Sequence, residues 1–270
     1  MSDEIKNTDD HHPKEKISRR DFLLFGVAAA GTLALRRLTN PEAGSRAFGD
    51  HPTGEHVWGM VVDIDLCIGC KYCTYSCQAV NNLSDDMIYN VVTTETTEIG
   101  DEFFLSRPCM QCESPPCVHV CPVGATYIRD DGIVAMDYDL CIGCRYCGIA
   151  CPYDVRVFNW YEHTEDSPRV PDFGTPELPP RPRGVMEKCH FCSHRIDYGL
   201  ERGLVPGIDA AATPACVVAC PTGSRVFGDL NDPESPINQK LQISDNPIRL
   251  REELSTNPRV LYIPPRAKES

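Results

Sequence analysis

Apolar residues along this chain occur in short runs, which polar and turn-forming residues separate. The runs at Val57–Asp65 and Val155–Trp160 predict strands. The segment Thr126–Asp137 has Asp131 and Gly132 between apolar-rich flanks, which is typical of a β-hairpin. We therefore expect an α+β fold with short strands, short helices and long loops.

One longer uncharged run, Phe22–Leu35, lies near the N-terminus. It is shorter than the about 20 apolar residues that a transmembrane helix needs, and no other segment approaches that length. Arg19 and Arg20 precede it within the run SRRDFL, which resembles a twin-arginine export signal. The alternative is an arginine pair before an ordinary buried helix. The Gly/Ala-rich run after the pair favours a signal, which would occupy residues 1–47 together with a linker.

The sixteen cysteines fall into four groups of four, and none is left over. The third group, CIGCRYCGIACP, fits the C-x2-C-x2-C-x3-C-P run of bacterial ferredoxins. Because a [4Fe–4S] cubane takes four thiolates, the count predicts four all-thiolate cubanes. The groups in chain order are Cys67, Cys70, Cys73 and Cys77; Cys109, Cys112, Cys117 and Cys121; Cys141, Cys144, Cys147 and Cys151; Cys189, Cys192, Cys216 and Cys220.

The spacing within a group has physical consequences. Gly69 and Gly143 lie inside tight loops, where a small residue lets the backbone approach a cluster. The fourth cysteine lies beyond the loop, and in two-cluster ferredoxins it ligates the other cluster. A proline follows it in three groups and suits the first position of a helix, so we expect helices to begin there. In the first group Gln78 replaces this proline. The prolines are Pro122, Pro152 and Pro221.

Zinc and disulfides are the alternatives for the cysteines. A zinc ribbon uses two CxxC pairs per metal and has no role for a third cysteine followed by x3-C-P. Disulfides are conceivable in an exported protein, but CxxCxxC is poor geometry for bridging between neighbours. Clusters therefore remain the preferred interpretation. Export in a folded state would allow them to be inserted in the reducing cytoplasm first.

The chain contains an internal repeat. Asp65–Cys73 and Asp139–Cys147 are identical except for Lys71 and Arg145, and the second group has a counterpart in the fourth. This order predicts two duplicated ferredoxin-like modules within residues 48–230, followed by a C-terminal extension over residues 231–270 that packs on them. The core would be small, so metal ligation should supply much of the folding energy.

Charge and side-chain type add little to this hypothesis. The net charge of −13 argues against nucleic acid as a partner. Lys71, Arg145 and Lys188 lie beside cysteines and would raise a cluster potential slightly, or would be solvated surface charges. We expect Trp58, Trp160, Tyr72 and Tyr146 to pack over clusters and His119 and His190 to pack or form hydrogen bonds. The proline-rich stretch at residues 168–182 predicts a surface loop of the kind that contacts partners.

Taken together, the motifs resemble the iron–sulfur subunits of the molybdopterin oxidoreductase superfamily, such as those of tetrathionate, polysulfide, thiosulfate and dimethyl sulfoxide reductases. DLCIGCKYCTYSC, CMQCESPPCVHVCPVGAT, EKCHFC and PACVVACPTGSRVFGDLNDPESP carry the resemblance. It implies a four-cluster electron-transfer subunit with a molybdopterin catalytic subunit and a polytopic membrane quinol-interacting subunit as partners. An uncleaved signal or such a partner would hold it at the periplasmic face of the membrane.

The resemblance also implies how the ligands are shared. Some relatives have tryptophan where this chain has Cys144 and hold a three-iron cluster there, so Cys144 implies a fourth cubane. The implied sets are Cys67, Cys70, Cys73 and Cys220 (set 1); Cys189, Cys192, Cys216 and Cys77 (set 2); Cys109, Cys112, Cys117 and Cys151 (set 3); Cys141, Cys144, Cys147 and Cys121 (set 4).

Two other functions compete with this one. A hydrogenase or formate dehydrogenase iron–sulfur subunit has similar clusters, but many of those carry a C-terminal membrane helix that this sequence lacks. A self-standing enzyme would need an open coordination site or a nucleophile with a base, and every cluster ligand is already supplied. We find no catalytic residue, dinucleotide fingerprint or phosphate loop in the sequence.

Overall fold

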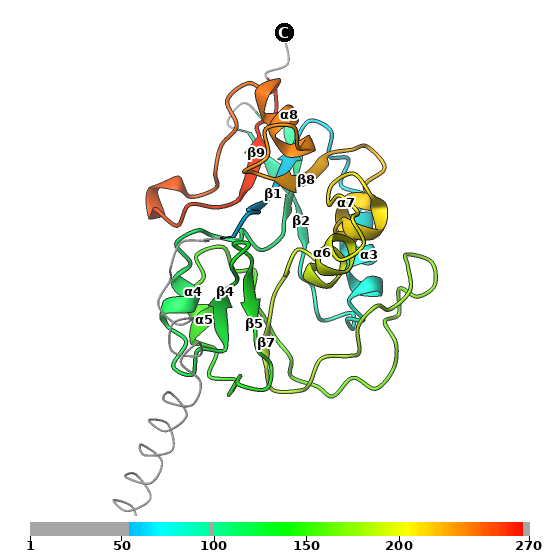
Figure 1. Ribbon diagram of the computed structural model, residues 1–270, viewed down its shortest axis with the longest axis vertical. Helices are drawn as coiled ribbons and strands as arrows, with labels where there is room; N and C mark the ends of the chain where they lie inside the picture. Colours follow the sequence, from blue (N-terminus) through cyan, green and yellow to red (C-terminus); the bar gives the residue numbers. More distant parts are fainter. Residues whose placement is uncertain (1–53, 98–99, 267–270) are drawn as a thin grey trace, which may run out of the picture. The chain divides into compact units, whose positions relative to one another are not determined.

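A computed structural model describes residues 54–97 and 100–266 of the protein. The predicted export signal, with Arg19 and Arg20, lies outside these residues. The described chain folds as short strands and short helices joined by long loops, an α+β arrangement (Figure 1). None of the helices in the described ranges combines the length and apolar character that crossing a membrane requires.

The largest sheet has three strands in the order β8-β1-β9. The central strand, β1 (Trp58–Asp63), is buried along its whole length, which confirms the strand predicted there. β8 (Arg225–Asp229) pairs with it antiparallel, and β9 (Val260–Ile263) pairs with it parallel. Helix α8 (Pro236–Gln242) packs its buried Ile237 against this sheet. Residues far apart in the chain therefore meet at β1.

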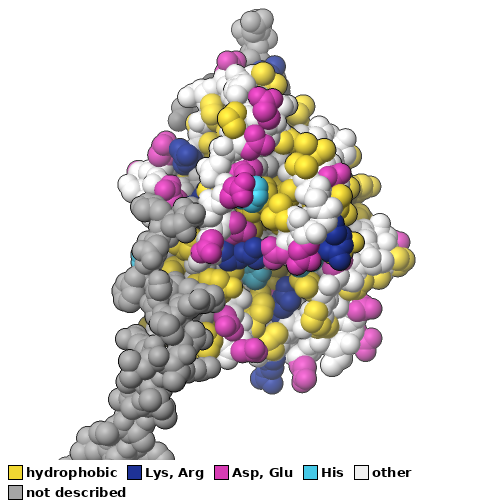
Figure 2. All heavy atoms as spheres, viewed as in Figure 1, with side chains coloured by type: hydrophobic (Ala, Val, Ile, Leu, Met, Phe, Trp, Pro, Cys, Tyr) yellow, Lys and Arg dark blue, Asp and Glu magenta, His cyan; other side chains and the backbone are white. Residues whose placement is uncertain are grey.

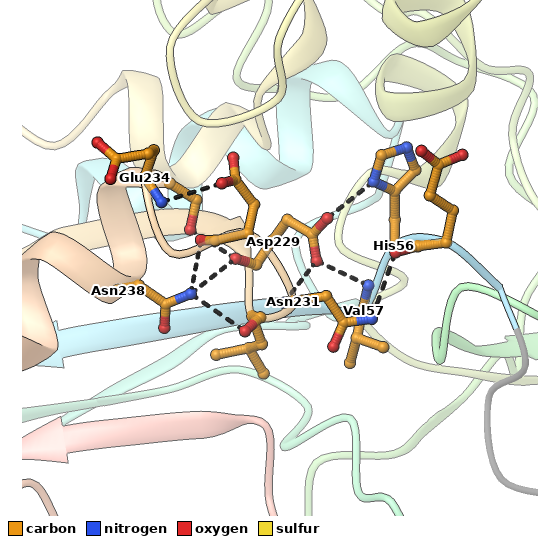
Figure 3. A network of polar contacts seen from close by, with 10 residues as sticks. His56, Val57, Asp229, Asn231, Glu234 and Asn238 are labelled. Atoms are coloured by element: carbon orange, nitrogen blue, oxygen red, sulfur yellow. Dashed lines mark hydrogen bonds and ion pairs between the residues drawn. The ribbon is translucent and has the colours of Figure 1, made fainter.

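A polar network holds the end of β8 to the start of β1 (Figure 3). The Asp229 carboxylate accepts hydrogen bonds from the backbone N–H groups of Val57 and Asn231, both at 2.9 Å, and lies 2.7 Å from His56 Nδ1. The Asn238 amide donates to the Asp229 carbonyl at 3.2 Å. These bonds satisfy backbone groups at the sheet end, which would otherwise cost free energy when buried.

A smaller pair of strands has the same register, relative to its cysteines, as β1 and β8. The hairpin predicted over Thr126–Asp137 is confirmed as β4 (Thr126–Ile128) and β5 (Val134–Met136). In the large sheet Val62 faces Arg225, and in the hairpin Met136 faces Thr126. In both cases the first partner is the fifth residue before the first cysteine of a C-x-x-C loop, and the second is the fifth residue after the cysteine of a C-P step. The two pairings therefore have the same register relative to their cysteines.

Two further pairs of strands complete the set. β2 (Val91–Thr96) and β3 (Glu102–Arg107) form a hairpin that the sequence pattern did not reveal. Of the strand predicted over Val155–Trp160, only β6 (Val157–Phe158) lies in a ladder. Its partner β7 (Met186–Glu187) is equally short, so the ladder ends after two residues.

Helices do not begin at the C-P steps, so that prediction was wrong. Three four-residue helices end just before the fourth cysteine of their groups, and a proline follows that cysteine. The residue before a proline is disfavoured in helical geometry, so the C-P step stops the helix rather than starting it. These helices are α4 (Pro116–His119), α5 (Tyr146–Ile149) and α7 (Ala215–Val218).

The first group, which lacks the proline, has the longer helix. α3 (Tyr72–Val80) spans nine residues and continues through Cys77 and Gln78. The buried Gln78 amide donates to the Ser84 carbonyl at 3.1 Å and accepts from Arg169 Nε at 3.3 Å. Gln78 therefore permits the extra helical turn and joins it to the chain beyond.

Further short helices and the proline-rich loop complete the described fold. The insertion between Cys192 and Cys216 forms α6 (Ser193–Leu200) and the short 3-10 helix η1 (Ala210–Ala212); a second 3-10 helix, η2, spans Glu252–Leu254. The proline-rich loop predicted to contact partners lies partly on the protein itself, since Glu177 N donates to the Val80 carbonyl at 2.9 Å. Glu177 also lies 2.9 Å from His194 of α6. Figure 1 shows α3, α6 and α7 gathered on one side of the fold.

Candidate iron–sulfur sites

The cysteines of set 1 line one cavity of about 330 Å³, counting its open mouth. Cys67 and Cys70 lie in the loop after β1, and Cys73 lies at the start of α3. Cys220 reaches the same cavity from the turn after α7. α3 and α7 are in contact, which brings the first and fourth cysteine groups together.

The cysteines of set 4 line a similar cavity of about 280 Å³. Cys141 and Cys144 lie in the loop after β5, and Cys147 lies in α5. Cys121 enters from the turn after α4, which contacts α5. The second and third cysteine groups are thus joined in the same manner as the first and fourth.

Set 2 gathers between α3 and the fourth cysteine group. Cys77 lies one helical turn beyond the α3 cysteine of set 1, about 6 Å along the helix axis. The Asn81 amide nitrogen lies 3.6 Å from Cys77 Sγ and 3.7 Å from Cys192 Sγ. Burial raises the pKa of Cys77 well above its ordinary value, and the neighbouring thiols of Cys192, Cys189 and Cys216 raise it further.

The cysteines of set 3 also lie close enough together for their thiols to raise one another's pKa. Burial raises the pKa of the Cys112 thiol, and the thiols of Cys109, Cys117 and Cys151 also raise it. Cys151 belongs to the third group in sequence, yet the thiols that raise its pKa after burial are Cys109 and Cys117 of the second. All four predicted sets therefore lie together in the fold, while iron ligation by them stays a prediction.

The thiols of set 1 and those of set 4 each line a cavity. Within residues 54–97 and 100–266, no three His, Cys, Asp or Glu side chains converge closely enough to hold a single metal ion. A zinc ion would need its sulfur ligands about 2.3 Å away. The cavities lined by the thiols of sets 1 and 4 have room for a cluster of several metal and sulfide atoms.

In each cysteine group the backbone turns at the residue immediately before the second cysteine, and that residue has a positive φ. A left-handed residue in a tight loop turns backbone N–H groups inward, as in the concavities that hold anions and iron–sulfur clusters. A side chain at Gly143 would place its Cβ 2.2 Å from the Gly184 carbonyl oxygen. The sequence revealed the two glycines but not their counterparts. The four residues are Gly69 (69°), Gln111 (46°), Gly143 (68°) and Phe191 (53°).

A buried arginine lies beside sets 1 and 2. Arg225 on β8 is only 4% exposed, and its guanidinium donates to Cys216 Sγ at 3.3 Å. It also donates to Asn90 and to Ser106, whose hydroxyl lies 3.6 Å from Cys73 Sγ. Burial lowers the pKa of Arg225, but the thiols of Cys216 and Cys73 outweigh it and raise the pKa above its ordinary value.

A second buried arginine, Arg156, lies beside sets 3 and 4. Its Nη1 donates to Met136 Sδ at 3.3 Å, and its Nη2 is buried without a hydrogen-bond partner. Burial lowers the pKa of Arg156, yet the thiols of Cys117 and Cys147 raise it above its ordinary value. An unpaired buried N–H of a cation is costly. A negatively charged cluster would supply the missing acceptor, so these residues fit iron–sulfur clusters.

Lys188 is fully buried, so it is not the solvated surface charge that the sequence allowed. Its ammonium donates to the carbonyls of Val134 and, at 3.0 Å, Cys189. Gln111 bridges the same two residues: its amide donates to the Cys189 carbonyl and accepts from Val134 N, both at 2.7 Å. Sequence reasoning named Lys188 but had no signal for Arg156, Arg225 or Gln111 beyond the shared C-P-x3-R spacing of the two arginines.

Several predicted covering residues are exposed instead. Trp58 is buried, but Trp160, Tyr72 and Tyr146 are between 46% and 58% exposed. Arg145 is exposed too and stacks over the Trp160 ring, with 4.9 Å from its guanidinium carbon to the ring centre. The packing predicted over the clusters is therefore wrong for these three aromatic residues. On the described part of the face in Figure 2, acidic, basic and apolar side chains are interspersed.

Comparison with known proteins identifies the class. Residues 100–167 and residues 140–224 each match a family described as a 4Fe-4S dicluster domain. One subunit of the selenate reductase of Mesobacillus selenatarsenatis is 42% identical over 97% of this chain and 99% of its own length. The iron–sulfur cluster-binding subunit of menaquinone reductase from Nitratidesulfovibrio vulgaris is 40% identical over 76% and 88%. One subunit of the tetrathionate reductase of Salmonella typhimurium is 35% identical over 91% and 88%.

The chain belongs to the family of iron–sulfur subunits of respiratory reductases that includes the tetrathionate, polysulfide and selenate enzymes. It is a [4Fe–4S] protein, and its function is electron transfer. These relatives do not favour the alternative of a hydrogenase or formate dehydrogenase subunit.

Proposed function

We propose that the protein carries four [4Fe–4S] clusters, held by sets 1 to 4, and passes electrons along them in that order or its reverse. The order follows from the ligands. Helix α3 carries a cysteine of set 1 and one of set 2, and α7 carries a cysteine of set 2 and leads to Cys220 of set 1. Each of α4 and α5 likewise carries a cysteine of one set and leads to a cysteine of the other, and the two helices are in contact. Gln111 and Lys188 connect the Cys189 loop of set 2 to the Cys109–Cys112 loop of set 3.

The burial of the cysteines is the observation that carries this proposal. In set 1 and in set 4, three of the four cysteines are partly exposed. In set 2 all four are buried, and in set 3 only Cys151 is partly exposed. Clusters in sets 1 and 4 would therefore exchange electrons with partners, while those in sets 2 and 3 would relay electrons through the interior.

The chain's own residues would hold and tune the clusters. A bound [4Fe–4S] cluster supplies the one-electron chemistry. The left-handed turns aim N–H groups at its sulfurs, and burial limits its contact with water. The Asn81 amide beside Cys77 and Cys192 is a further donor at thiol sulfurs, and the Ser106 hydroxyl lies within hydrogen-bonding distance of Cys73 Sγ. Such hydrogen bonds raise a reduction potential.

The two cluster pairs also support a duplicated, ferredoxin-like arrangement. One pair is built on β1, β8, α3 and α7, and the other on β5, β4, α5 and α4. The shared register of the two strand pairings relative to their cysteines favours descent of both from one unit.

Iron and acid-labile sulfide analysis tests the cluster count. We expect the anaerobically purified chain to contain iron and sulfide for four cubanes; half that iron, or zinc in its place, would contradict the proposal. Replacing Cys144 with serine should alter the EPR signal of set 4 and leave the other three. The buried Cys192 of set 2 offers a second such variant.

We also propose partners and a location. By analogy with its relatives, the protein would link a molybdopterin-containing catalytic subunit to a polytopic membrane quinol-interacting subunit, at the periplasmic face of the cytoplasmic membrane. Affinity purification from membranes of the native host should recover both partners with this chain. Changing Arg19 and Arg20 to lysine should retain the protein in the cytoplasm, whereas unchanged export would remove the twin-arginine hypothesis.

A further inference from the structure

Three of the four positively charged side chains buried in the described fold, all but Arg259, lie where two successive thiol sets meet. Arg225, Lys188 and Arg156 are 4%, 0% and 9% exposed, respectively. Basic side chains are seldom buried to this degree unless a negative group compensates them. The placement of each one relative to the thiols identifies the negative groups.

Arg225 lies between set 1 and set 2. It bonds directly to Cys216 of set 2 at 3.3 Å, and through Ser106 it reaches Cys73 of set 1. It lowers the pKa of Cys67 in set 1 and of Cys77 in set 2, in each case against the larger effect of burial. One cation therefore acts on thiols of both sets.

Arg156 has the corresponding place between set 3 and set 4. Its Nη1 donates to Met136 Sδ at 3.3 Å, and Met136 lines the cavity of set 4. Burial lowers the pKa of Arg156, but the thiols of Cys117 in set 3 and Cys147 in set 4 raise it above its ordinary value. Both arginines are the fifth residue after a group's last cysteine, and both contact a methionine sulfur at 3.3 Å, Met60 for Arg225 and Met136 for Arg156. In the strand register the counterpart of Arg225 is Thr126, and Arg156 donates to the Thr126 hydroxyl at 3.4 Å.

Lys188 occupies the remaining junction, between set 2 and set 3. It adjoins Cys189 of set 2 in sequence and donates to the Cys189 carbonyl at 3.0 Å. Its other acceptor is the carbonyl of Val134, whose N–H bonds to Gln111 in the middle of the set 3 loop. Burial lowers the pKa of Lys188, and the thiols of Cys109 and Cys117, both in set 3, act in the opposite direction.

We propose that Arg225, Lys188 and Arg156 form a row of buried cations, one at each junction between clusters, which raises the reduction potentials of the two clusters beside it. The proposal rests on the four ligand sets given above. Four thiolates leave a cubane with net negative charge, and reduction adds one more. A cation in a buried, weakly screened position favours the reduced form far more than an exposed cation does.

The exposed basic residues beside the same clusters provide a matched comparison. Lys71 lines the cavity of set 1 and Arg145 lines that of set 4, but both are exposed to solvent. If charge sign alone mattered, their removal would shift the potentials as much as removal of the buried cations. If burial matters as proposed, their removal has a small and salt-dependent effect.

EPR-monitored redox titration of the full, cluster-loaded chain tests the proposal. Lys188→Met keeps the length of the side chain and removes its charge. We expect the equilibrium constants for reduction of the clusters in sets 2 and 3 to fall about tenfold or more, which is about 59 mV for one electron. Sets 1 and 4 should change much less. Lys188→Arg should retain the wild-type potentials, and Lys71→Met should leave sets 2 and 3 unchanged. Serine variants of one cysteine per set assign the signals.

The outcomes separate this inference from the cluster proposal. A wild-type chain with fewer than four EPR-active clusters contradicts the cluster proposal itself. Four clusters whose potentials stay fixed in Lys188→Met, or all shift equally, overturn only the row of cations. If Lys188→Met loads no iron, Arg156→Gln and Arg225→Gln test the other junctions. Loss of iron in every neutral variant but not in Lys188→Arg, Arg156→Lys or Arg225→Lys supports a need for charge. Loss in both kinds of variant indicates packing alone and overturns the proposal.

Discussion

At the scale of single residues, the left-handed turn before each second cysteine decides which side chains its loop accepts. Glycine adopts this backbone without strain, whereas other residues incur roughly 1–2 kcal/mol. Gly69 and Gly143 were therefore predictable from sequence, but Gln111 and Phe191 were not, because their turns are held by contacts that the sequence does not show. Gln111, for example, is fixed by hydrogen bonds to Cys189 and Val134.

Replacing Gly143 with alanine should weaken the set 4 site. The new Cβ would meet the Gly184 carbonyl oxygen at 2.2 Å, in addition to the strain of a φ of 68°. Gly203→Ala is the matched control, because Gly203 has a φ of 70° and open space around it. We expect Gly143→Ala to cost about 1–3 kcal/mol more than the control and to reduce bound iron. Equal melting temperatures and equal iron content in the two variants would contradict this.

At the scale of elements, a single position determines the length of a cluster-binding helix. A proline after the fourth cysteine accompanies four-residue helices, whereas Gln78 accompanies the nine-residue α3. The sequence correctly marked these prolines as helix boundaries but suggested the wrong end. The strand at β1 and the Asp-Gly hairpin of β4 and β5 were predicted well, whereas the strand predicted over Val155–Trp160 has only two residues in a ladder. β8 and β9 were missed because their stability comes from pairing with β1, far away in sequence.

Gln78→Pro should therefore shorten α3 and destabilise the protein. Proline within a helix removes a backbone hydrogen bond and clashes with the preceding turn, at a cost of about 3 kcal/mol or more. Gln78→Ala keeps the helix and loses only the side-chain bonds to Ser84 and Arg169, at about 1 kcal/mol each. Circular dichroism should show less helix and a lower melting temperature in the proline variant. A melting temperature no lower than that of Gln78→Ala would mean that α3 tolerates the break.

At the scale of the whole molecule, the cysteines contribute to the core as well as to the sites. The largest apolar cluster contains six buried cysteines beside Trp58, Met60, Phe227 and other side chains. The grouping of the sixteen cysteines was clear from their spacing, and the family resemblance implied how the groups exchange ligands. The buried cations were not predictable, because Arg156 and Arg225 resemble surface residues until the fold places them between thiols.

Removing the clusters should therefore loosen the whole described fold rather than single loops. Burial raises the pKa of thiols such as Cys77 and Cys192, so without iron they would stay protonated and unable to cross-link the helices. We expect anaerobic chelation of iron to lower the melting temperature markedly and to abolish near-UV circular dichroism. The control is the same treatment without chelator, and an unchanged melting curve would show that the polypeptide folds independently of its metal.

The positions of the ligand sets in the sequence also determine the order in which their cysteines become available during synthesis. As proposed, sets 3 and 4 would draw only on residues 109 to 151, so both would be complete once Cys151 has been made. Sets 1 and 2 combine the earliest cysteines with the latest, and Cys67, Cys70 and Cys73 wait for Cys220. A ribosome that stalls in the long loop before β7 would release a chain with two finished ligand sets and four thiols lacking their partners. Cluster assembly would therefore finish last at the two sets that the final third of the chain completes.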